Sequence, residues 1–367
     1  MQQKRPKKLN STPVLPPDVV QSLASSSPPT LPYIGGQAVL EGVMMRAPGS
    51  FAVAVRKADG SILVRERPMV PDARRWVKWP LIRGVMSLVE SLKLGAEALK
   101  FSTDQLELAQ SESSGEEKQS GSGTTGTLML LIVVLFFIAA PQAGAAGLTK
   151  LFSWDLPVQS AGFQGLTGVI KLTIVIGYLS LIRRIPDIRR VFQYHGAEHK
   201  SISAYEAGEE LTVQNAQRKT TLHPRCGTTF LVMVALISIV VFTAVGGLLP
   251  RIATGNAALD NVVFFLEKLP FLPLIVAFTF ELQRASARYC TTGPLRALLW
   301  PGFLVQKITT IEPDDDQVEV ALAALRATLF RESGAEVSER RDDVAFADYA
   351  AILRAKRLRE PALASHS

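Results

Sequence analysis

Residues 227–249, GTTFLVMVALISIVVFTAVGGLL, decide the class of this chain, because this run contains no charged side chain. A helix of about 20 apolar residues is long enough to cross a hydrocarbon core of about 30 Å. We therefore expect a transmembrane helix here. The positive mean hydropathy of the whole chain also favours a membrane protein over a set of soluble domains.

Three further apolar runs lie on either side of this one. Residues 127–148 carry no charge, and residues 163–182 are interrupted only by Lys171. Residues 261–282 are broken by prolines, so we expect residues 261–268 to form an interfacial lead-in and the span to begin at 269. The sequence predicts a mainly α, polytopic membrane protein with about four transmembrane helices.

The basic residues predict the orientation. The segment 183–226 contains many Lys and Arg residues, whereas residues 149–162 contain only Lys150. Short loops rich in Lys and Arg stay in the cytoplasm, so we expect segment 183–226 and both termini on the cytoplasmic side. A net charge of +7 next to membrane segments suits anionic lipid headgroups. We expect membrane lipids as partners and no nucleic acid, because the basic residues are not interleaved with exposed aromatic residues.

The region before the first span predicts a small cytoplasmic module. Residues 51–57 and 61–67 alternate around Asp59-Gly60, which is typical of a β-hairpin. Residues 81–101 have apolar side chains at helical spacing, so we expect an amphipathic helix that lies on the membrane or against the helix bundle.

A C-terminal helix is expected at 318–329, where apolar residues form a helical stripe. The acids at 312–316 precede it. They suit a helix N-terminus, where the helix dipole stabilises them, better than a second metal site. Residues 294–308 are too short and too interrupted for a confident crossing, and they favour a re-entrant or interfacial helix.

The expected organisation follows from these segments. It comprises a disordered tail (1–30), the N-terminal hairpin and helix (31–110), a Ser- and Gly-rich linker (111–126), the membrane domain (127–310) with its cytoplasmic loop (183–226), the C-terminal helix (311–330) and a loose charged tail (331–367).

Histidine and cysteine are scarce and clustered, which points to a metal site. Three of the four histidines and one of the two cysteines lie between His195 and Cys226. On a helix, His195 and His199 share one face, with Glu198 beside them. In this H-x-x-E-H arrangement the histidines would hold zinc and Glu198 would accept a proton from water. The alternative is an exposed or hydrogen-bonded helical pair without a metal.

The second half of the cluster is His223-Pro224-Arg225-Cys226. We expect His223 to be the N-cap of the following span and Cys226 to lie one turn inside it, with its thiolate favoured by the helix dipole. Both are candidate ligands, although Cys226 could equally be a small buried residue at the helix entry. Four protein ligands would make a closed structural site, whereas three ligands and a water would make a catalytic one.

Two more acids, each with a basic neighbour, could reach the surroundings of the metal. Glu281 ends the last predicted span, and Arg284 follows on the same helical face; an ordinary ion pair also explains them. Glu41 lies among glycines near Arg46, in a segment that could fold over the metal or form a tight turn with an internal ion pair.

Four blocks in this order resemble the YqhQ-like family of bacterial membrane proteins. The blocks are Gly36-Gln37-Ala38-Val39-x-Glu41-Gly42-Val43-Met44-Met45-Arg46, where x is any residue, His195-Gly196-Ala197-Glu198-His199-Lys200, His223-Pro224-Arg225-Cys226-Gly227-Thr228 and Glu312-Pro313-Asp314-Asp315. The resemblance covers residues 31–330. The family is described as predicted metal-dependent enzymes of unknown function. It implies a multi-pass protein of the bacterial cytoplasmic membrane.

Two hypotheses of different classes remain. The first is an integral-membrane zinc hydrolase at the cytoplasmic surface, acting on a lipid headgroup, a lipid-linked precursor or a peptide. The second is a membrane scaffold in which the metal only fixes the cytoplasmic loop to the following span. Metal transport is weaker, because no pair of predicted spans carries facing His, Asp or Glu at mid-depth.

Overall fold

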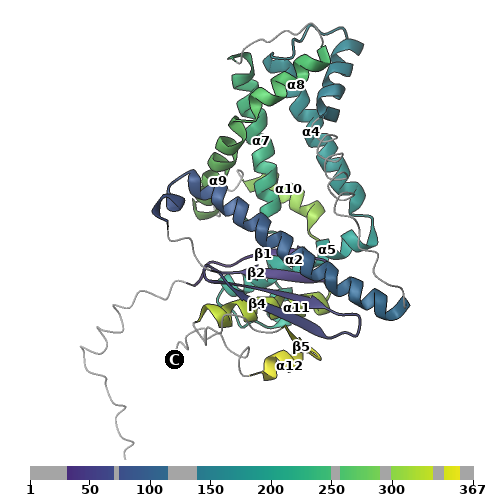
Figure 1. Cartoon of the computed structure of the whole chain (residues 1–367), viewed down its shortest axis with the longest axis vertical. Coiled ribbons are helices and arrows are strands. Elements are labelled where there is room, and N and C mark those ends of the chain that lie inside the picture. The colour runs from purple at the N-terminus through teal and green to yellow at the C-terminus, as the bar shows by residue number, and fades with distance from the viewer. Residues whose placement is uncertain are drawn as a thin grey trace, which may run out of the picture. The chain divides into compact units, whose positions relative to one another are not determined.

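The computed structural model describes six segments of the chain, residues 31–69, 74–114, 139–248, 257–289, 299–333 and 343–355. Figure 1 shows a β-sheet with helices on both of its faces, together with a group of longer apolar helices.

The sheet has five antiparallel strands in sequence order, so each strand pairs with its neighbours along the chain. The strands are β1 (Gly35–Val39), β2 (Gly42–Arg46), β3 (Ser50–Arg56), β4 (Ile62–Pro68) and β5 (Val344–Phe346). The predicted hairpin is present as β3 and β4. The sequence prediction did not include β1 and β2, which are formed by the glycine-rich block, or β5, which comes from the predicted loose tail.

Both faces of the sheet are buried, because successive side chains of a strand point to opposite sides. One set packs toward α11 (Asp315–Glu332) and α5 (Pro186–Glu206), and the other packs toward α2 (Ile82–Ser114). The first set includes Val43, Met45, Ala52 and Ala54; the second includes Met44, Phe51, Val53 and Val55.

Helix α11 is buried along most of its length between the sheet and α5. Small residues such as Ala321, Ala323 and Ala324 allow this close approach on several sides. The helix begins after Asp314, whose backbone N–H donates to Oε1 of Gln317 at 2.9 Å. The acidic block therefore lies at a helix N-terminus, as the sequence predicts.

Helix α2 packs on the opposite face of the sheet through Leu94, Ala98 and Phe101. It also contacts α9 (Phe271–Tyr289), where Gly84 lies against the ring of Phe280. The expected amphipathic helix is thus present and packs against protein through these residues, whereas Val89, Leu92, Leu99 and Leu108 of the same helix are exposed. It continues to Ser114, four residues into the predicted linker, and residues 115–126 lie outside the described segments.

Two described helices are long and apolar enough to cross a membrane, α4 (Ala161–Ile182) and α7 (Gly227–Val245). A third candidate is the pair α8 (Ala257–Lys268) and α9, which is bent by 44° at the break that Pro270 predicts. Of the first predicted span, residues 127–138 lie outside the described segments and residues 139–151 are helical.

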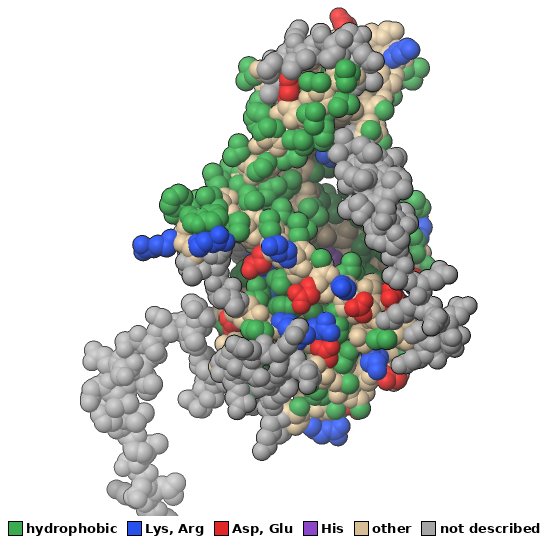
Figure 2. Space-filling model, in the orientation of Figure 1, with side chains coloured by type: hydrophobic (Ala, Val, Ile, Leu, Met, Phe, Trp, Pro, Cys, Tyr) green, Lys and Arg blue, Asp and Glu red, His purple; other side chains and the backbone are tan. Residues whose placement is uncertain are grey.

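The surface of these helices is apolar. Leu231 on α7, Val169 on α4 and Leu274 on α9 are each at least 60% exposed. Figure 2 shows hydrophobic side chains covering the face of the apolar helices, whereas charged side chains gather over the sheet and α2. Membrane association explains this surface, since a soluble monomer rarely exposes so large an apolar patch.

The remaining elements are short. They are η1 (Arg75–Lys78), α6 (Val213–Gln217), η2 (Gly246–Leu248), α10 (Trp300–Thr309) and α12 (Tyr349–Arg354). Helix α10 packs on α7, and its expected interfacial or re-entrant position stays a prediction. Part of the predicted loose tail is ordered, because Ile352 enters the core and Arg65 binds Asp343 through two hydrogen bonds of 2.6 and 2.8 Å.

Candidate metal centre

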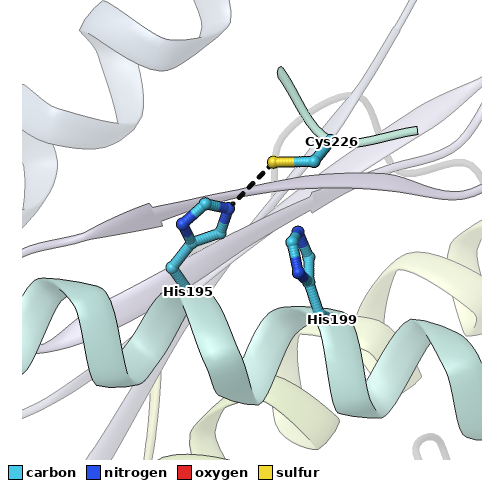
Figure 3. Close-up of side chains that lie close together, drawn as sticks. All are labelled: His195, His199 and Cys226. Carbon is cyan, nitrogen blue, oxygen red and sulfur yellow. Dashed lines mark hydrogen bonds between the residues drawn. The ribbon is translucent and has the colours of Figure 1, made fainter. Parts of the chain in front are cut away.

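Helix α5 carries the first half of the cluster. Pro186 occupies its first turn, where no backbone N–H is needed, and the helix is buried from Tyr194 to Ser201. His195 and His199 are one turn apart and point the same way, as Figure 3 shows. Their ring centroids are 4.5 Å apart.

His195 is held by its backbone-facing nitrogen. Nδ1 lies 2.8 Å from the carbonyl oxygen of Thr309, so Nδ1 carries the proton and donates it there. Nε2 then faces Sγ of Cys226 at 3.2 Å, the contact drawn as a dashed line in Figure 3.

His199 is held in the same manner. Its Nδ1–H donates to the carbonyl oxygen of Thr221, which leaves Nε2 with a free lone pair. That Nε2 atom is buried and has no hydrogen-bond partner. A buried nitrogen without a partner is costly, and a bound divalent metal would accept this lone pair.

The ligand atoms of His195, His199 and Cys226 all lie within 4.8 Å of one another. Metal-binding histidines typically donate their second ring N–H to a carbonyl, which fixes the tautomer and the ring orientation. Both histidines do so here. Two imidazoles and a thiolate also form a donor set that suits zinc and other borderline metals. The residues present therefore fit a divalent metal.

Cys226 comes from the N-terminus of α7. It is the N-cap of that helix, whose first residue is Gly227. The sequence prediction placed the N-cap at His223, three residues too early. The reason is Gln306 of α10, which accepts from the His223 backbone N–H at 2.9 Å and donates to the His223 carbonyl oxygen at 2.7 Å. The His223 backbone is thereby held before the helix begins.

His223 lies beside the three residues rather than among them. Its ring centroid is 5.6 Å from that of His199. Its Nε2 is 3.3 Å from Oε2 of Glu206, and its Nδ1 accepts a long hydrogen bond of 3.4 Å from the Arg225 backbone. The structure thus brings together three of the four candidate ligands and places the fourth next to them.

Glu198 is buried next to the cluster, with 5% of its surface exposed. It packs against β1, where the backbone N–H of Ala38 donates to its carboxylate and Gly36 lies directly against its side chain. The second carboxylate oxygen, Oε2, is buried without a partner. Glu198 is therefore a base candidate that is adjacent to the three ligand atoms and separate from them.

The side chains of the cluster have shifted pKa values, which favour a deprotonated Cys226 and a protonated His195. Burial alone would raise the pKa of the Cys226 thiol, but His195 and His199 favour the thiolate and hold that pKa well below its usual range. Burial also opposes protonation of His195, yet the Cys226 thiolate and the Glu198 carboxylate outweigh it and raise the pKa of His195 to about 9. A thiolate and an imidazolium therefore face each other across the 3.2 Å contact between Sγ of Cys226 and Nε2 of His195.

The neighbouring groups are shifted toward their neutral forms. Burial raises the pKa of Glu198 to about 8 and lowers that of His223 to about 4. Burial, followed by the charge of His195, lowers the pKa of His199 as well. A carboxyl group with a pKa near neutrality suits proton transfer.

The other predicted residues hold structural elements together instead. Glu41 forms a two-pronged ion pair with Arg190 of α5, and the hydroxyl of Tyr194 is 3.3 Å from its carboxylate. Arg46 pairs with Glu90 of α2 at 3.3 Å, so the predicted pair of Glu41 with Arg46 is not formed.

The predicted pair at the end of α9 is also replaced. Glu281 binds Arg83 of α2, and its Oε1 lies 2.6 Å from Nε of that arginine. Arg284 is exposed. Within the described segments, the residues grouped for metal binding are His195, His199 and Cys226, and neither acid joins them.

The last residue of the histidine block connects it to the C-terminal acidic block. Nζ of Lys200 is buried, lies 2.7 Å from Oε2 of Glu312 and donates to the carbonyl oxygen of Gln217 at 2.8 Å. The Ile311 backbone N–H donates to the Phe192 carbonyl oxygen at 2.9 Å. The segment before α11 is thus fixed along α5.

Sequence reasoning did not find the groups that orient the histidines. Thr221 and Thr309 act through backbone carbonyl oxygens, which leave no signature in side-chain identity. Gln306 lies in an apolar helix far along the chain, and only the fold brings it to His223.

Comparisons with known proteins agree with the resemblance. The sequence profile of a family described as "Protein of unknown function (DUF1385)" matches residues 79–331. The chain is 30% identical over 321 residues to the "Uncharacterized protein YqhQ" of Bacillus subtilis (strain 168), an alignment that covers 84% of this chain and 96% of that protein. No solved structure matches.

Proposed function

This chain belongs to the DUF1385 family of proteins of unknown function, and we propose that it is a metal-dependent hydrolase acting at the cytoplasmic surface of the bacterial membrane. The observation that carries the proposal is the convergence of His195, His199 and Cys226, whose ligand atoms lie within 4.8 Å of one another. The unpartnered Nε2 of His199 supports it further.

The residues have distinct roles in this proposal. His195, His199 and Cys226 would hold a divalent metal, preferably zinc, which supplies Lewis acidity and lowers the pKa of water. Glu198 does not share the convergence point, so its carboxylate is available to take a proton from an attacking water and to return it to the leaving group. A pKa of about 8 in the metal-free protein fits a group that both accepts and releases protons near neutrality.

The substrate follows from the location. Cys226 directly precedes α7, an apolar helix long enough to cross the membrane. The cluster would therefore lie close to one membrane surface, and the basic residues of segment 183–226 favour the cytoplasmic side. We infer a substrate within or next to the membrane, such as a lipid headgroup, a lipid-linked precursor or a peptide.

A second candidate function is a metal-stabilised scaffold, which burial favours. His195, His199 and Cys226 are each at most 9% exposed, and closed structural sites are typically buried. In that role the metal would fix α5 to the N-terminus of α7, and Glu198 would have no chemical task.

A single substitution separates the two functions. Glu198→Gln keeps the shape of the side chain but removes the base. If the protein is a hydrolase, this variant keeps its metal and melting temperature, yet fails to complement a deletion strain because the rate falls by a factor on the order of a hundred or more. Full complementation by Glu198→Gln would overturn the hydrolase and leave the scaffold. Metal content is measured on the same purified samples.

A further inference from the structure

A cleft of about 430 Å³ lies next to the segments that orient the histidines. Its walls come from the end of α4, the end of α10, the segment that connects α6 to α7 and the segment before α11. The polar lining residues are Arg183, Lys307, Thr220, Thr221, Thr310 and Glu312. None of these side chains has a role in the proposed hydrolysis.

The cleft has an excess of positive charge. Arg183 and Lys307 contribute two cations. Glu312 is the acid in the lining, and its carboxylate is already neutralised by the buried Lys200 at 2.7 Å. An anion entering the cleft therefore meets Arg183 and Lys307 without an unbalanced opposing charge.

Two backbone carbonyl oxygens at the end of α10, which would repel an anion, already accept hydrogen bonds. The Lys307 carbonyl oxygen accepts a hydrogen bond from the Arg183 guanidinium. The Gln306 carbonyl oxygen accepts from both the backbone N–H and the hydroxyl of Thr310, each at 2.7 Å. Arg183 thus has a fixed position, and an arginine held this way still offers further N–H donors, which suit phosphate oxygens.

Apolar side chains flank the cations on α4 and α10. Leu181 lies two residues before Arg183 and is 62% exposed, and Leu304 lies three residues before Lys307 and is 51% exposed. Arg183 itself directly follows the apolar helix α4. Basic side chains at the end of a span, next to exposed apolar ones, suit a ligand with an anionic head and a hydrocarbon part.

We propose that this cleft binds the phosphate group of an anionic membrane lipid, with Arg183 and Lys307 contacting the phosphate oxygens. The shared chemistry is a phosphate anion, and free phosphate is the other source to be tested. The proposal is independent of metal binding and of hydrolysis, because no residue of the three-ligand cluster contributes its side chain to the cleft.

The test uses the purified full chain in detergent, with two probes. One probe is short-chain phosphatidylglycerol, compared with diacylglycerol of equal chain length, which has no phosphate, and the other is inorganic phosphate. Binding is measured by native mass spectrometry and by the shift in melting temperature. The double variant Arg183→Gln/Lys307→Gln should weaken binding about tenfold or more, since it removes two charge-assisted contacts.

A matched control is available in the same segment. Arg184→Gln/Arg189→Gln removes two exposed cations that do not line the cleft, and it should change binding by less than about twofold. Binding of phosphatidylglycerol but not inorganic phosphate identifies the ligand as a lipid, and binding of inorganic phosphate identifies it as a small anion. Either result supports the phosphate site if the double variant no longer binds that probe.

Two results would overturn the proposal. One is that wild-type protein does not bind inorganic phosphate and binds phosphatidylglycerol no better than diacylglycerol. The other is that the lining variant and the control variant bind equally well. If Arg183→Gln impairs folding because its bond to Lys307 is lost, Lys307→Glu alone replaces the double variant, since this exposed side chain can be reversed in charge without loss of packing.

Discussion

Gly196 lies directly against the carbonyl oxygen of Ile311, so closely that a methyl group on Gly196 would come within 2.1 Å of that oxygen. This contact sets the distance between α5 and the segment that precedes α11. Thr309, two residues before Ile311 at the end of α10, supplies the carbonyl oxygen that orients His195. Gly196, which lies between His195 and His199, is therefore required by the close packing of α5 against Ile311.

We predict that Gly196→Ala lowers both stability and metal content. The neighbouring atom is backbone, which cannot move away as a flexible side chain can, so a cost of about 1–3 kcal/mol is expected from overpacking. Chemical denaturation and metal analysis of the purified variant measure the two effects. Gly177→Ala is the control, because a methyl group there meets nothing within 4 Å. Wild-type behaviour of Gly196→Ala would contradict the close approach.

Gly36→Ala should affect function without affecting metal content. A methyl group at Gly36 would lie 2.7 Å from Cγ of Glu198, so the carboxylate must move, while the three ligand atoms are untouched. A displacement of a base by about 1 Å can reduce a rate by a factor on the order of a hundred.

The companion variant is Gly35→Ala, where the nearest atom is 3.8 Å away on Arg46. Complementation and metal content are measured for both variants. Equal complementation by Gly36→Ala and Gly35→Ala would argue against a role for the position of Glu198.

The ligand set is tested by comparing His199→Ala with His223→Gln. We expect His199→Ala to abolish stoichiometric metal binding, because its Nε2 points at the convergence point. His223→Gln should keep the metal, because the nitrogens of His223 face Glu206 and the Arg225 backbone.

Mass spectrometry of the native protein gives the metal stoichiometry of each variant. A chelator should lower the melting temperature of the wild type and of His223→Gln, and leave that of His199→Ala unchanged. Loss of metal from His223→Gln to the same extent would make His223 a fourth ligand and favour the closed structural site.

The predicted orientation is open to a direct measurement. Reporter fusions at Ser160, before α4, and at Gly208, after α5, should give opposite signals, because the two sites are separated by one apolar helix. We expect the reporter at Gly208 to be cytoplasmic. Reporters on the same side of the membrane would remove α4 as a span.

The sequence allowed prediction of those features that depend on local spacing. The pairing of His195 with His199, the β3–β4 hairpin and the acidic start of α11 all follow from residues a few positions apart. The sequence did not allow prediction of whether Cys226 or His223 joins His195 and His199 as the third ligand. That choice depends on Gln306, which holds the His223 backbone from another helix.

The five-stranded sheet was missed for a similar reason. The block that forms β1 and β2 is rich in glycine and has no clear alternation. Its strands are stabilised by burial against α5 and α11, which are distant in sequence. The repeated alanines of α11 reveal a helix but not that it is enclosed on several sides. Partners that lie far apart in the chain leave little trace in local pattern.

The burial of the sheet by α11 has a consequence for how the protein is made. Strands β1 to β4 are complete once Pro68 has been synthesised, yet α11, which covers one of their faces, ends at Glu332. At translation rates of about 5–20 residues per second, on the order of ten seconds or more separate these events. During this interval one face of the sheet lacks α11. The histidine block is also synthesised before Thr309, whose carbonyl oxygen orients His195, so its geometry is completed only after α10 has been made.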